Sequence, residues 1–170
     1  MQIRIAKTGD AASIASLGKQ TFTETFGHLF RDEDDLHFYL QNTFSTAKIS
    51  SSLNKPNNVF WIAFVEKKAV GYAKLKLDSP SPFIEEKKVS QLQKIYVLKE
   101  YLSMKIGFKL QDALLSKAKE KGADTIWLSV LISNERAIGF YLKNGFELIG
   151  NHDYQIGKER FNFKAMAKKL

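Results

Sequence analysis

Residues 92–130 read LQKIYVLKEYLSMKIGFKLQDALLSKAKEKGADTIWLSV, and this stretch decides the fold. Leu92 to Val97 predicts a strand, and the polar segment from Tyr101 to Gly107 predicts a loop. The loop leads into an amphipathic helix that ends near Lys121, and Thr125 to Val130 predicts the next strand. The chain therefore runs through this region in the order strand, loop, helix and strand.

A second helix is predicted directly after this stretch. Asn134 is a good N-cap residue, and Gly145 stands where a left-handed residue commonly ends a helix. Ala137, Phe140 and Tyr141 share one face because they are spaced three and four residues apart. Tyr141 therefore lies on an otherwise apolar face, and its hydroxyl points toward whatever that face covers.

The point where the loop enters the first of these helices, at Ile106 and Gly107, predicts an anion site. Main-chain N–H groups are unpaired in the first turn of a helix, and the helix dipole is positive there. A phosphate can bind to such a turn without a dedicated cation. Because Gly107 has no side chain, a ligand can approach the backbone, and a diphosphate would lie at this bend.

The N-terminal part predicts a short strand at Ile3 to Ala6 and a helix that Asp10 caps. The apolar side chains of that helix are Ala11, Ile14, Ala15 and Leu17. Aromatic residues then recur at helical spacings in two helices, namely Phe22, Phe26, Phe30, Phe38 and Tyr39. The acidic run Asp32 to Asp35 separates them, and it is typical of a helix start; recognition of an amine substrate is the alternative. Ser50 to Ser52 predicts the end of the second helix.

The remaining segments predict further strands. Val59 to Val65 and Val70 to Leu77 read as a hairpin, and Asp78 to Lys88 reads as a mobile loop. Glu147 to Gly150 and Phe161 to Ala167 read as closing strands, joined by a loop that holds Tyr154 and Gly157. Together these elements predict an α/β (α+β) fold in which one mixed sheet has helices on both faces, in a single domain over residues 1–170.

Composition limits the functional classes. The chain has no cysteine, which excludes disulfides and thiolate metal sites, and its three histidines are not at metal-ligand spacing, so we expect no metal. It has no run of 18 apolar residues and no signal-like N-terminus, so we expect a soluble, cytoplasmic protein without membrane contact. The formal charge of +8 favours anionic ligands and disfavours polycations.

The sequence resembles the GCN5-related N-acetyltransferase (GNAT) family. The residues that carry the resemblance are the strand end Ile95-Tyr96-Val97, the loop to Gly107, and the run Asn134, Ala137, Ile138, Phe140, Tyr141, Gly145 and Phe146. Within the family, the chain is most similar to PaiA-type spermidine/spermine N-acetyltransferases. That narrower match rests on residues 21–26, Gly71 to Lys74, Ile126 to Leu128 and residues 166–170.

The resemblance implies a GNAT fold with a mixed, mostly antiparallel sheet, and direct transfer of an acetyl group from acetyl-coenzyme A to an amine. It implies a cofactor-binding set of Ile95, Tyr96, Val97, Ser103, Met104, Lys105, Ile106, Gly107, Phe108, Asn134 and Tyr141. Main-chain N–H groups near Ile95 to Val97 would polarise the thioester carbonyl, in a place where the strands splay apart. Tyr141 would be the catalytic general acid that protonates the leaving sulfur.

The family pattern is altered in two places. The phosphate loop has Leu102, Lys105 and Gly107 where the family usually has Gln or Arg, then Gly, then Gly or Ala, so only the last position is kept. Gln91 and Gln93 stand where relatives often carry carboxylates, and glutamine cannot accept a proton. The base therefore stays open among Glu24, Glu85, Glu86 and a chain of ordered waters.

The acceptor is expected to be a small amine or a protein amine. The resemblance suggests a polyamine, and the basic charge argues against one. Phe22, Phe26 and Glu24 are the candidate substrate-binding residues, with core packing as the alternative for each Phe. The competing interpretation is a non-catalytic protein of the same fold that senses acyl-coenzyme A and contacts another macromolecule. Nucleic acid is not an expected partner of the enzyme, and exposed apolar patches leave room for a homodimer.

Overall fold

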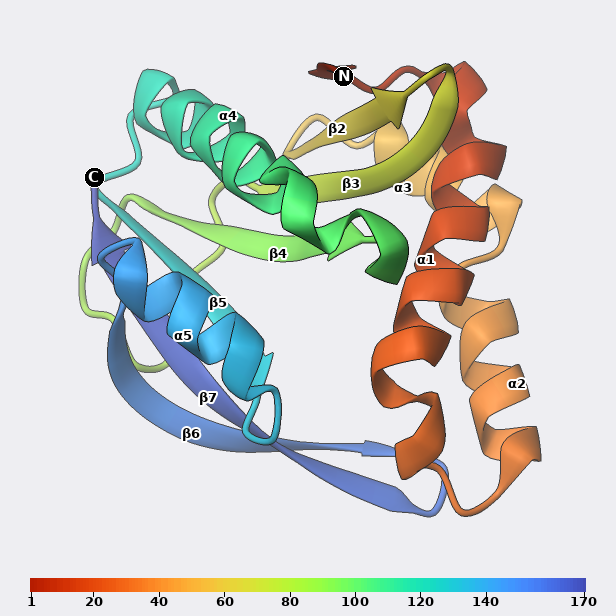
Figure 1. The fold of residues 1–170 in the computed structure, drawn as a ribbon. Coiled ribbons are helices and arrows are strands. Elements are labelled where there is room, and N and C mark those ends of the chain that lie inside the picture. Colours follow the sequence, from red (N-terminus) through yellow and green to blue (C-terminus); the bar gives the residue numbers. More distant parts are fainter.

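The computed structural model describes all residues from Met1 to Leu170, and its centre is a seven-stranded sheet (Figure 1). The strands are β1 (Gln2–Ile5), β2 (Asn58–Val65), β3 (Lys68–Lys76), β4 (Val89–Val97), β5 (Thr125–Leu131), β6 (Glu147–Ile156) and β7 (Glu159–Lys169). Their order in the sheet is β1-β2-β3-β4-β5-β7-β6. All neighbours are antiparallel except β4 and β5, which confirms the prediction of a mixed, mostly antiparallel sheet.

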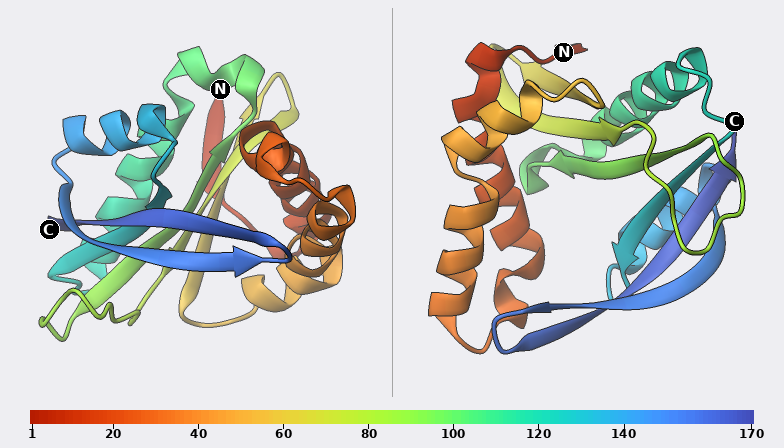
Figure 2. Two further views of the ribbon diagram at one scale, coloured as in Figure 1. Left: turned by 90° about the horizontal axis from the view of Figure 1, so that it is seen from below. Right: turned by 180° about the vertical axis from the view of Figure 1, so that it is seen from behind.

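Helices cover both faces of this sheet (Figure 2). One layer contains α1 (Ala11–Phe26), α2 (Glu33–Thr43) and α3 (Thr46–Leu53), and the other contains α4 (Ile106–Glu120) and α5 (Glu135–Lys143). Ile14 of α1, Ile62 of β2 and Leu110 of α4 are fully buried in one large core. None of the helices is long and apolar enough to cross a bilayer.

Strands β4 and β5 run side by side only at their beginnings. Val89, Ser90 and Gln91 pair with Thr125, Ile126 and Trp127, and no pair follows. On the opposite edge of β4 the register with β3 shifts, because Leu75 pairs with Leu92 while Lys74 pairs with Lys94. Gln93 is thus an extra, bulged residue, and a bulge bends its strand and increases the twist. The second half of β4 therefore has a free edge on the β5 side.

The closing hairpin is longer than the sequence predicts. The predicted loop around Tyr154 is wrong: β6 continues to Ile156 and pairs with β7 along its whole length, with Tyr154 opposite Phe161. Only Gly157, at φ +56°, and Lys158 form the turn. The sequence does not predict the second half of β6, because this edge strand has mostly exposed side chains and therefore shows no apolar alternation.

The N-terminal helices also differ from the prediction in detail. The chain predicted to form one helix up to Ser50–Ser52 breaks at the buried Phe44, and Ser45 starts α3 by accepting a hydrogen bond from Lys48 N (3.1 Å). Asp10 precedes α1 as predicted, but its carboxylate accepts from Lys7 N (2.7 Å) and Arg4 instead of a helix N–H. A 3₁₀ turn at Thr8–Asp10 precedes the helix, and the N–H of Ala11 donates to Thr8 O in this turn.

Candidate active site

The divergence of β4 and β5 opens a cleft of about 570 Å³. It is bounded by the second half of β4, the start of α4, helix α5, the aromatic side chains of α1 and the inner face of the β6–β7 hairpin. No Asp or Glu lines this cleft, whereas Lys94, Lys105 and Arg136 do. The cleft is therefore positively charged, in agreement with the anionic ligand that the composition predicts.

One end of the cleft is formed by the loop before α4 and the first turn of that helix. Ser103, Lys105, Gly107 and Phe108 line it. A side chain at Gly107 would meet nothing nearer than Ile95 Cγ2 at 4.0 Å, so the backbone of the first turn is accessible. Because the first N–H groups of a helix have no partner within it, this end can bind an anion such as a phosphate.

Lys105 begins α4 in a left-handed conformation, at φ +57° and ψ +20°. An L residue with a Cβ is rarely found there, and glycine adopts the conformation without strain. The glycine that the family pattern has at this position therefore has a conformational explanation. Lys105 keeps the conformation and adds a positive charge at the mouth of the cleft.

The free edge of β4 forms the floor of the cleft next to this end. Ile95, Tyr96 and Val97 all line the cleft, and their backbone groups have no strand partner on the β5 side. An extended amide chain can pair with such an edge as an added strand does. The edge can therefore pair with an extended ligand that carries amide groups.

Helix α5 brings Asn134 and Tyr141 to the opposite wall. Asn134 caps the helix, because its Oδ1 accepts a hydrogen bond from Ala137 N (3.2 Å). At the other end, Phe146 N donates to Tyr141 O (3.0 Å) and Gly145 N donates to Leu142 O (3.1 Å), the pairing of a Schellman motif. Gly145 is left-handed (φ +84°), which confirms the predicted helix end.

The side chain of Tyr141 is held between Phe140 and Phe146, at ring distances of 5.3 and 5.5 Å. The residue is 8% exposed, it lines the cleft, and its hydroxyl has no hydrogen-bond partner within the chain. Burial raises the pKa of Tyr141 well above its ordinary value. The phenol therefore keeps its proton and has it free to donate to a ligand.

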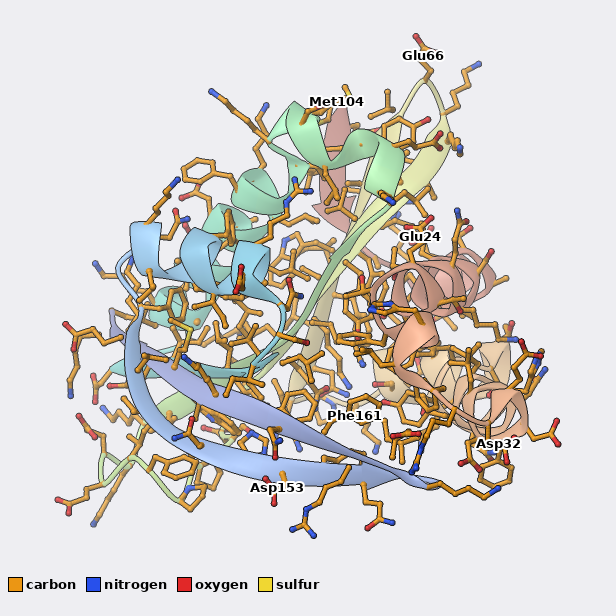
Figure 3. All side chains as sticks on the ribbon, turned by 60° about the horizontal axis from the view of Figure 1, so that its bottom comes forward. Glu24, Asp32, Glu66, Met104, Asp153 and Phe161 are labelled. Atoms are coloured by element: carbon orange, nitrogen blue, oxygen red, sulfur yellow. The ribbon has the colours of Figure 1, made fainter.

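Aromatic side chains close the other end of the cleft. Phe22 packs against Phe26 and Tyr39 at ring distances of 4.7 and 4.8 Å, and all three line the cleft. Phe161 of β7 lies between the hairpin and the N-terminal helices, with its ring 5.3 Å from that of Phe30 (Figure 3). Phe38 is 73% exposed and belongs to neither the cleft nor the core.

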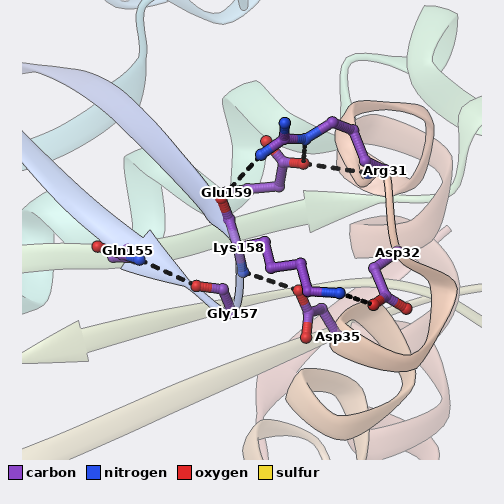
Figure 4. A network of polar contacts seen from close by, with 7 residues as sticks. All are labelled: Arg31, Asp32, Asp35, Gln155, Gly157, Lys158 and Glu159. Carbon is purple, nitrogen blue, oxygen red and sulfur yellow. Dashed lines mark hydrogen bonds and ion pairs between the residues drawn. The ribbon is translucent and has the colours of Figure 1, made fainter.

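A set of polar contacts ties the β6–β7 turn to the start of α2 and thereby bounds the aromatic end (Figure 4). Lys158 Nζ pairs with Asp32 (2.6 Å), and Lys158 N donates to Asp35 Oδ2 (2.7 Å). Arg31 Nε pairs with Glu159 (2.6 Å). Asp32 also caps α2 through Asp34 N (3.0 Å), so the acidic run serves capping and docking and does not reach the cleft.

Three of the predicted site residues lie outside the cleft. The side chain of Ile106 is fully buried in the core, and Met104 is 41% exposed on the outer surface (Figure 3). Glu24 is exposed on α1, where its Oε2 accepts a hydrogen bond from Lys99 N (3.0 Å). The candidate bases Glu85 and Glu86 do not line the cleft either, and Glu86 pairs with Lys169.

The structure adds three residues that the sequence analysis did not select. Lys94 lies on the floor of the cleft, and Ser129 lines its β5 wall. Ser129 Oγ is 2.7 Å from His152 Nε2, and the His152 ring stacks on Phe163 at 5.3 Å. The alternation along β4 could have placed Lys94 on the same face as Tyr96. The Ser129–His152 pair had no such signal, because β7 lies between β5 and β6 in the sheet.

The model of the Acetyltransferase (GNAT) family matches residues 15–146, which is most of the chain. The chain therefore belongs to the GNAT family of acetyltransferases. It is an acetyltransferase with acetyl-coenzyme A as its acetyl donor.

Relatives of the chain agree with this assignment. It is 27% identical to an uncharacterised N-acetyltransferase of Mycobacterium tuberculosis over 95% of this chain and 98% of the relative. It is 24% identical to an uncharacterised N-acetyltransferase of Lactobacillus delbrueckii over 89% and 87% of the two chains.

Solved structures share the fold. The PaiA N-acetyltransferase of Thermoplasma acidophilum, in complex with coenzyme A, has a TM-score of 0.74 and 24% identity over the full length of both chains. The ribosomal-protein-S18-alanine N-acetyltransferase of Escherichia coli has a TM-score of 0.71 and 19% identity, over 99% and 93% of the two chains. Only the second of these names states an acceptor, and the likeness shows the fold alone, so it does not select an acceptor for this chain.

Proposed function

We propose that this acetyltransferase moves the acetyl group directly from acetyl-coenzyme A to a primary amine, with both substrates in the cleft at once. The observation that carries the proposal is the convergence of three features in one cleft. These are the open first turn of α4, the unpaired edge of β4 and the free hydroxyl of Tyr141. The aromatic end provides separate space for the acceptor.

In this proposal, Ser103, Lys105 and the first-turn N–H groups at Ile106, Gly107 and Phe108 bind the diphosphate of acetyl-coenzyme A. Ile106 takes part through its backbone only, because its side chain lies in the core. The edge at Ile95 to Val97 binds the pantetheine arm of acetyl-coenzyme A and polarises the carbonyl. Asn134 orients the start of α5 beside that arm.

The nitrogen–carbon bond forms as the carbon–sulfur bond breaks, so one proton must leave the amine and one must reach the sulfur. Tyr141 donates the second proton. Removing the first is the larger cost, since an ammonium with a pKa of ~10.4 requires about 4.6 kcal/mol to present its free base at pH 7.

We assign the removal of that proton to Ser129 and His152. The Ser129 hydroxyl lines the cleft and contacts His152 Nε2 at 2.7 Å, so a proton can pass from the amine through Ser129 Oγ to the imidazole. The tautomer with its hydrogen on Nδ1 leaves Nε2 free to accept. No carboxylate lines the cleft to compete for this role.

The relay is tested with Ser129→Ala and His152→Gln. Each variant is expected to lower kcat/KM for the amine at least about 10-fold and to change its pH profile, because the proton can no longer pass from the amine to His152. Acetyl-coenzyme A binding should stay unchanged. A purely structural contact between β5 and β6 would instead lower thermal stability and leave the shape of the pH profile intact.

The function itself is tested by the release of free coenzyme A from acetyl-coenzyme A across pH, with spermidine, spermine, other small amines, amino acids and lysine peptides. Turnover that rises with pH as the amine deprotonates would support it. Spermidine and spermine are included because of the resemblance to PaiA-type enzymes, although a cleft without carboxylates offers a polycation no anionic partner. Binding of acetyl-coenzyme A without any turnover would favour the non-catalytic sensor.

A further inference from the structure

Lys94 and Lys74 lie directly opposite each other on the central strands β3 and β4. Both side chains are half-buried, and neither has an ion pair or a hydrogen bond within the chain. Like charges directly across a sheet are destabilising. Fold stability therefore gives no reason for this pair.

The ammonium of Lys94 is placed above aromatic rings, 4.9 Å from the centroid of Phe44 and 5.2 Å from that of Tyr96. The ammonium of Lys74 lies 5.4 Å from the Phe60 ring. Rings compensate part of the lost hydration, but they leave each charge without a counter-ion. Burial and the neighbouring lysines lower the pKa of Lys74 to about 8, and burial lowers the pKa of Lys94 to about 8.

Only Lys94 of this pair lines the cleft, and it does so beside the aromatic acceptor end. The chamber next to it is built from Phe22, Phe26 and Tyr39, and it contains no acidic side chain. Such a chamber takes an apolar body and has no carboxylate to pair with further cationic centres. The one charge at its floor is positive.

We propose that the acceptor is a primary amine on an apolar body that also carries a carboxylate, and that Lys94 pairs with this carboxylate. The inference rests on the proposed function and names its substrate class, amino carboxylates. The pair supplies the missing counter-ion of Lys94 and holds the acceptor by a charge-assisted hydrogen bond.

The test compares phenylalanine with phenethylamine, which lacks the carboxylate, and with spermidine, in wild type, Lys94→Met, Lys94→Arg and the control Lys76→Met. Lys76 is an exposed lysine on β3 that does not line the cleft. For each amine, kcat/KM of the wild type is divided by kcat/KM of Lys94→Met, so that the intrinsic reactivity of the amine cancels.

We expect Lys94→Met to lower kcat/KM for phenylalanine by about 10- to 100-fold, because a hydrogen bond to a charged group is lost. The value of kcat/KM for phenethylamine should change by about twofold at most. Lys94→Arg should keep most of the preference for the carboxylate, and Lys76→Met should change nothing. The KM for acetyl-coenzyme A should stay constant in all variants. Equal losses on both amines, or a wild-type preference for spermidine, would overturn the inference.

A binding measurement separates this inference from the proposed function. Titration of N-acetylphenylalanine and of N-phenethylacetamide into the protein in the presence of coenzyme A requires no turnover. Weaker binding of only the carboxylated compound to Lys94→Met supports the carboxylate site even if no amine in the panel reacts. Unchanged binding of both compounds rejects the site even if the enzyme is active.

Discussion

Tyr141 has a buried ring, a hydroxyl without a protein partner and a position on the cleft wall. The hydroxyl of Tyr141 is open to the cleft and has no partner within the chain, so a ligand bound there can accept its proton. Burial raises its pKa, which makes the phenol a weaker acid but ensures that it is protonated when the reaction needs a donor.

Replacing Tyr141 with Phe should lower kcat about 100-fold, because a positioned proton donor is lost. The KM for acetyl-coenzyme A should hardly change, since the ring and its packing against Phe140 and Phe146 remain. Steady-state kinetics and a thermal melt together check this. An unchanged kcat would remove Tyr141 from the mechanism.

Lys105 is a second position where a single residue affects the stability of the fold, because its backbone is left-handed. In the left-handed region a Cβ destabilises the folded state by about 1–2 kcal/mol. A glycine removes this strain but loses about 0.5–1 kcal/mol of stability, because it has more conformational freedom in the unfolded chain. Lys105→Gly should therefore raise the free energy of unfolding by up to about 1 kcal/mol. It should also weaken acetyl-coenzyme A binding if the charge contacts a phosphate.

The matched control is Lys109→Gly, an exposed position inside α4. There the same substitution should lower the free energy of unfolding by about 1 kcal/mol, because glycine is unfavourable in a helix interior. Denaturant melts of the two variants should shift in opposite directions. Shifts in the same direction would show that the conformation of Lys105 stores no strain.

At the scale of elements, the β6–β7 hairpin matters because its turn reaches the start of α2 (Figure 4). Gly157 makes this contact possible in two ways. Its φ of +56° suits glycine, and a side chain on it would collide with the carboxylate of Asp35. The docked turn keeps Ile156 and Phe161 against the aromatic end of the cleft.

Gly157→Ala should therefore separate the turn from α2 and raise the KM for the amine several-fold. The control is Gly122→Ala, which has the same kind of backbone (φ +85°) but nothing within 4 Å of the added methyl group. Both variants should lose about 1 kcal/mol of stability because alanine is strained in the left-handed backbone. Only Gly157→Ala should lose more stability than this and raise the KM for the amine. Identical kinetics in the two variants would count against a role of the docked turn in acceptor binding.

At the scale of the whole molecule, the chain carries a formal charge of +8 and places two of its positive charges inside the sheet region. A site that binds an anion commonly costs stability when it is empty. Lys94→Met should therefore raise the free energy of unfolding at pH 7 by about 1–2 kcal/mol, a value reduced from the full pKa shift because the side chain is partly exposed.

This gain should depend on pH in a defined direction. Between pH 8 and 10.5 the unfolded chain still holds the proton that folded Lys94 has released, so wild-type stability rises with pH in this range. The difference in the free energy of unfolding between Lys94→Met and wild type should thus be largest below pH 8 and should vanish toward pH 10.5. Lys76→Met should show no such difference, and a destabilised Lys94→Met at pH 7 would contradict the account.

Much of the fold follows from local signals in the sequence. The α4 start at Ile106, the cap at Asn134 and the left-handed Gly145 are each set by neighbours within a few residues, and all three were predicted. The second half of β6 and the break at Phe44 were not, because an exposed edge strand lacks an apolar pattern and the break depends on where Phe44 is buried. The loop before α4 and the first turn of that helix are local in the same sense.

The aromatic end of the cleft is different because it joins distant parts of the chain. The sequence by itself determined most of the elements, the family resemblance and the helix face on which Tyr141 lies, since periodicity and capping are read over short distances. Only the tertiary structure decided that Glu24 lies outside the cleft, that Lys94 has no counter-ion, and that Ser129 contacts His152 across β7. The physical reason is that burial, charge pairing and strand order arise from contacts between residues far apart in the chain.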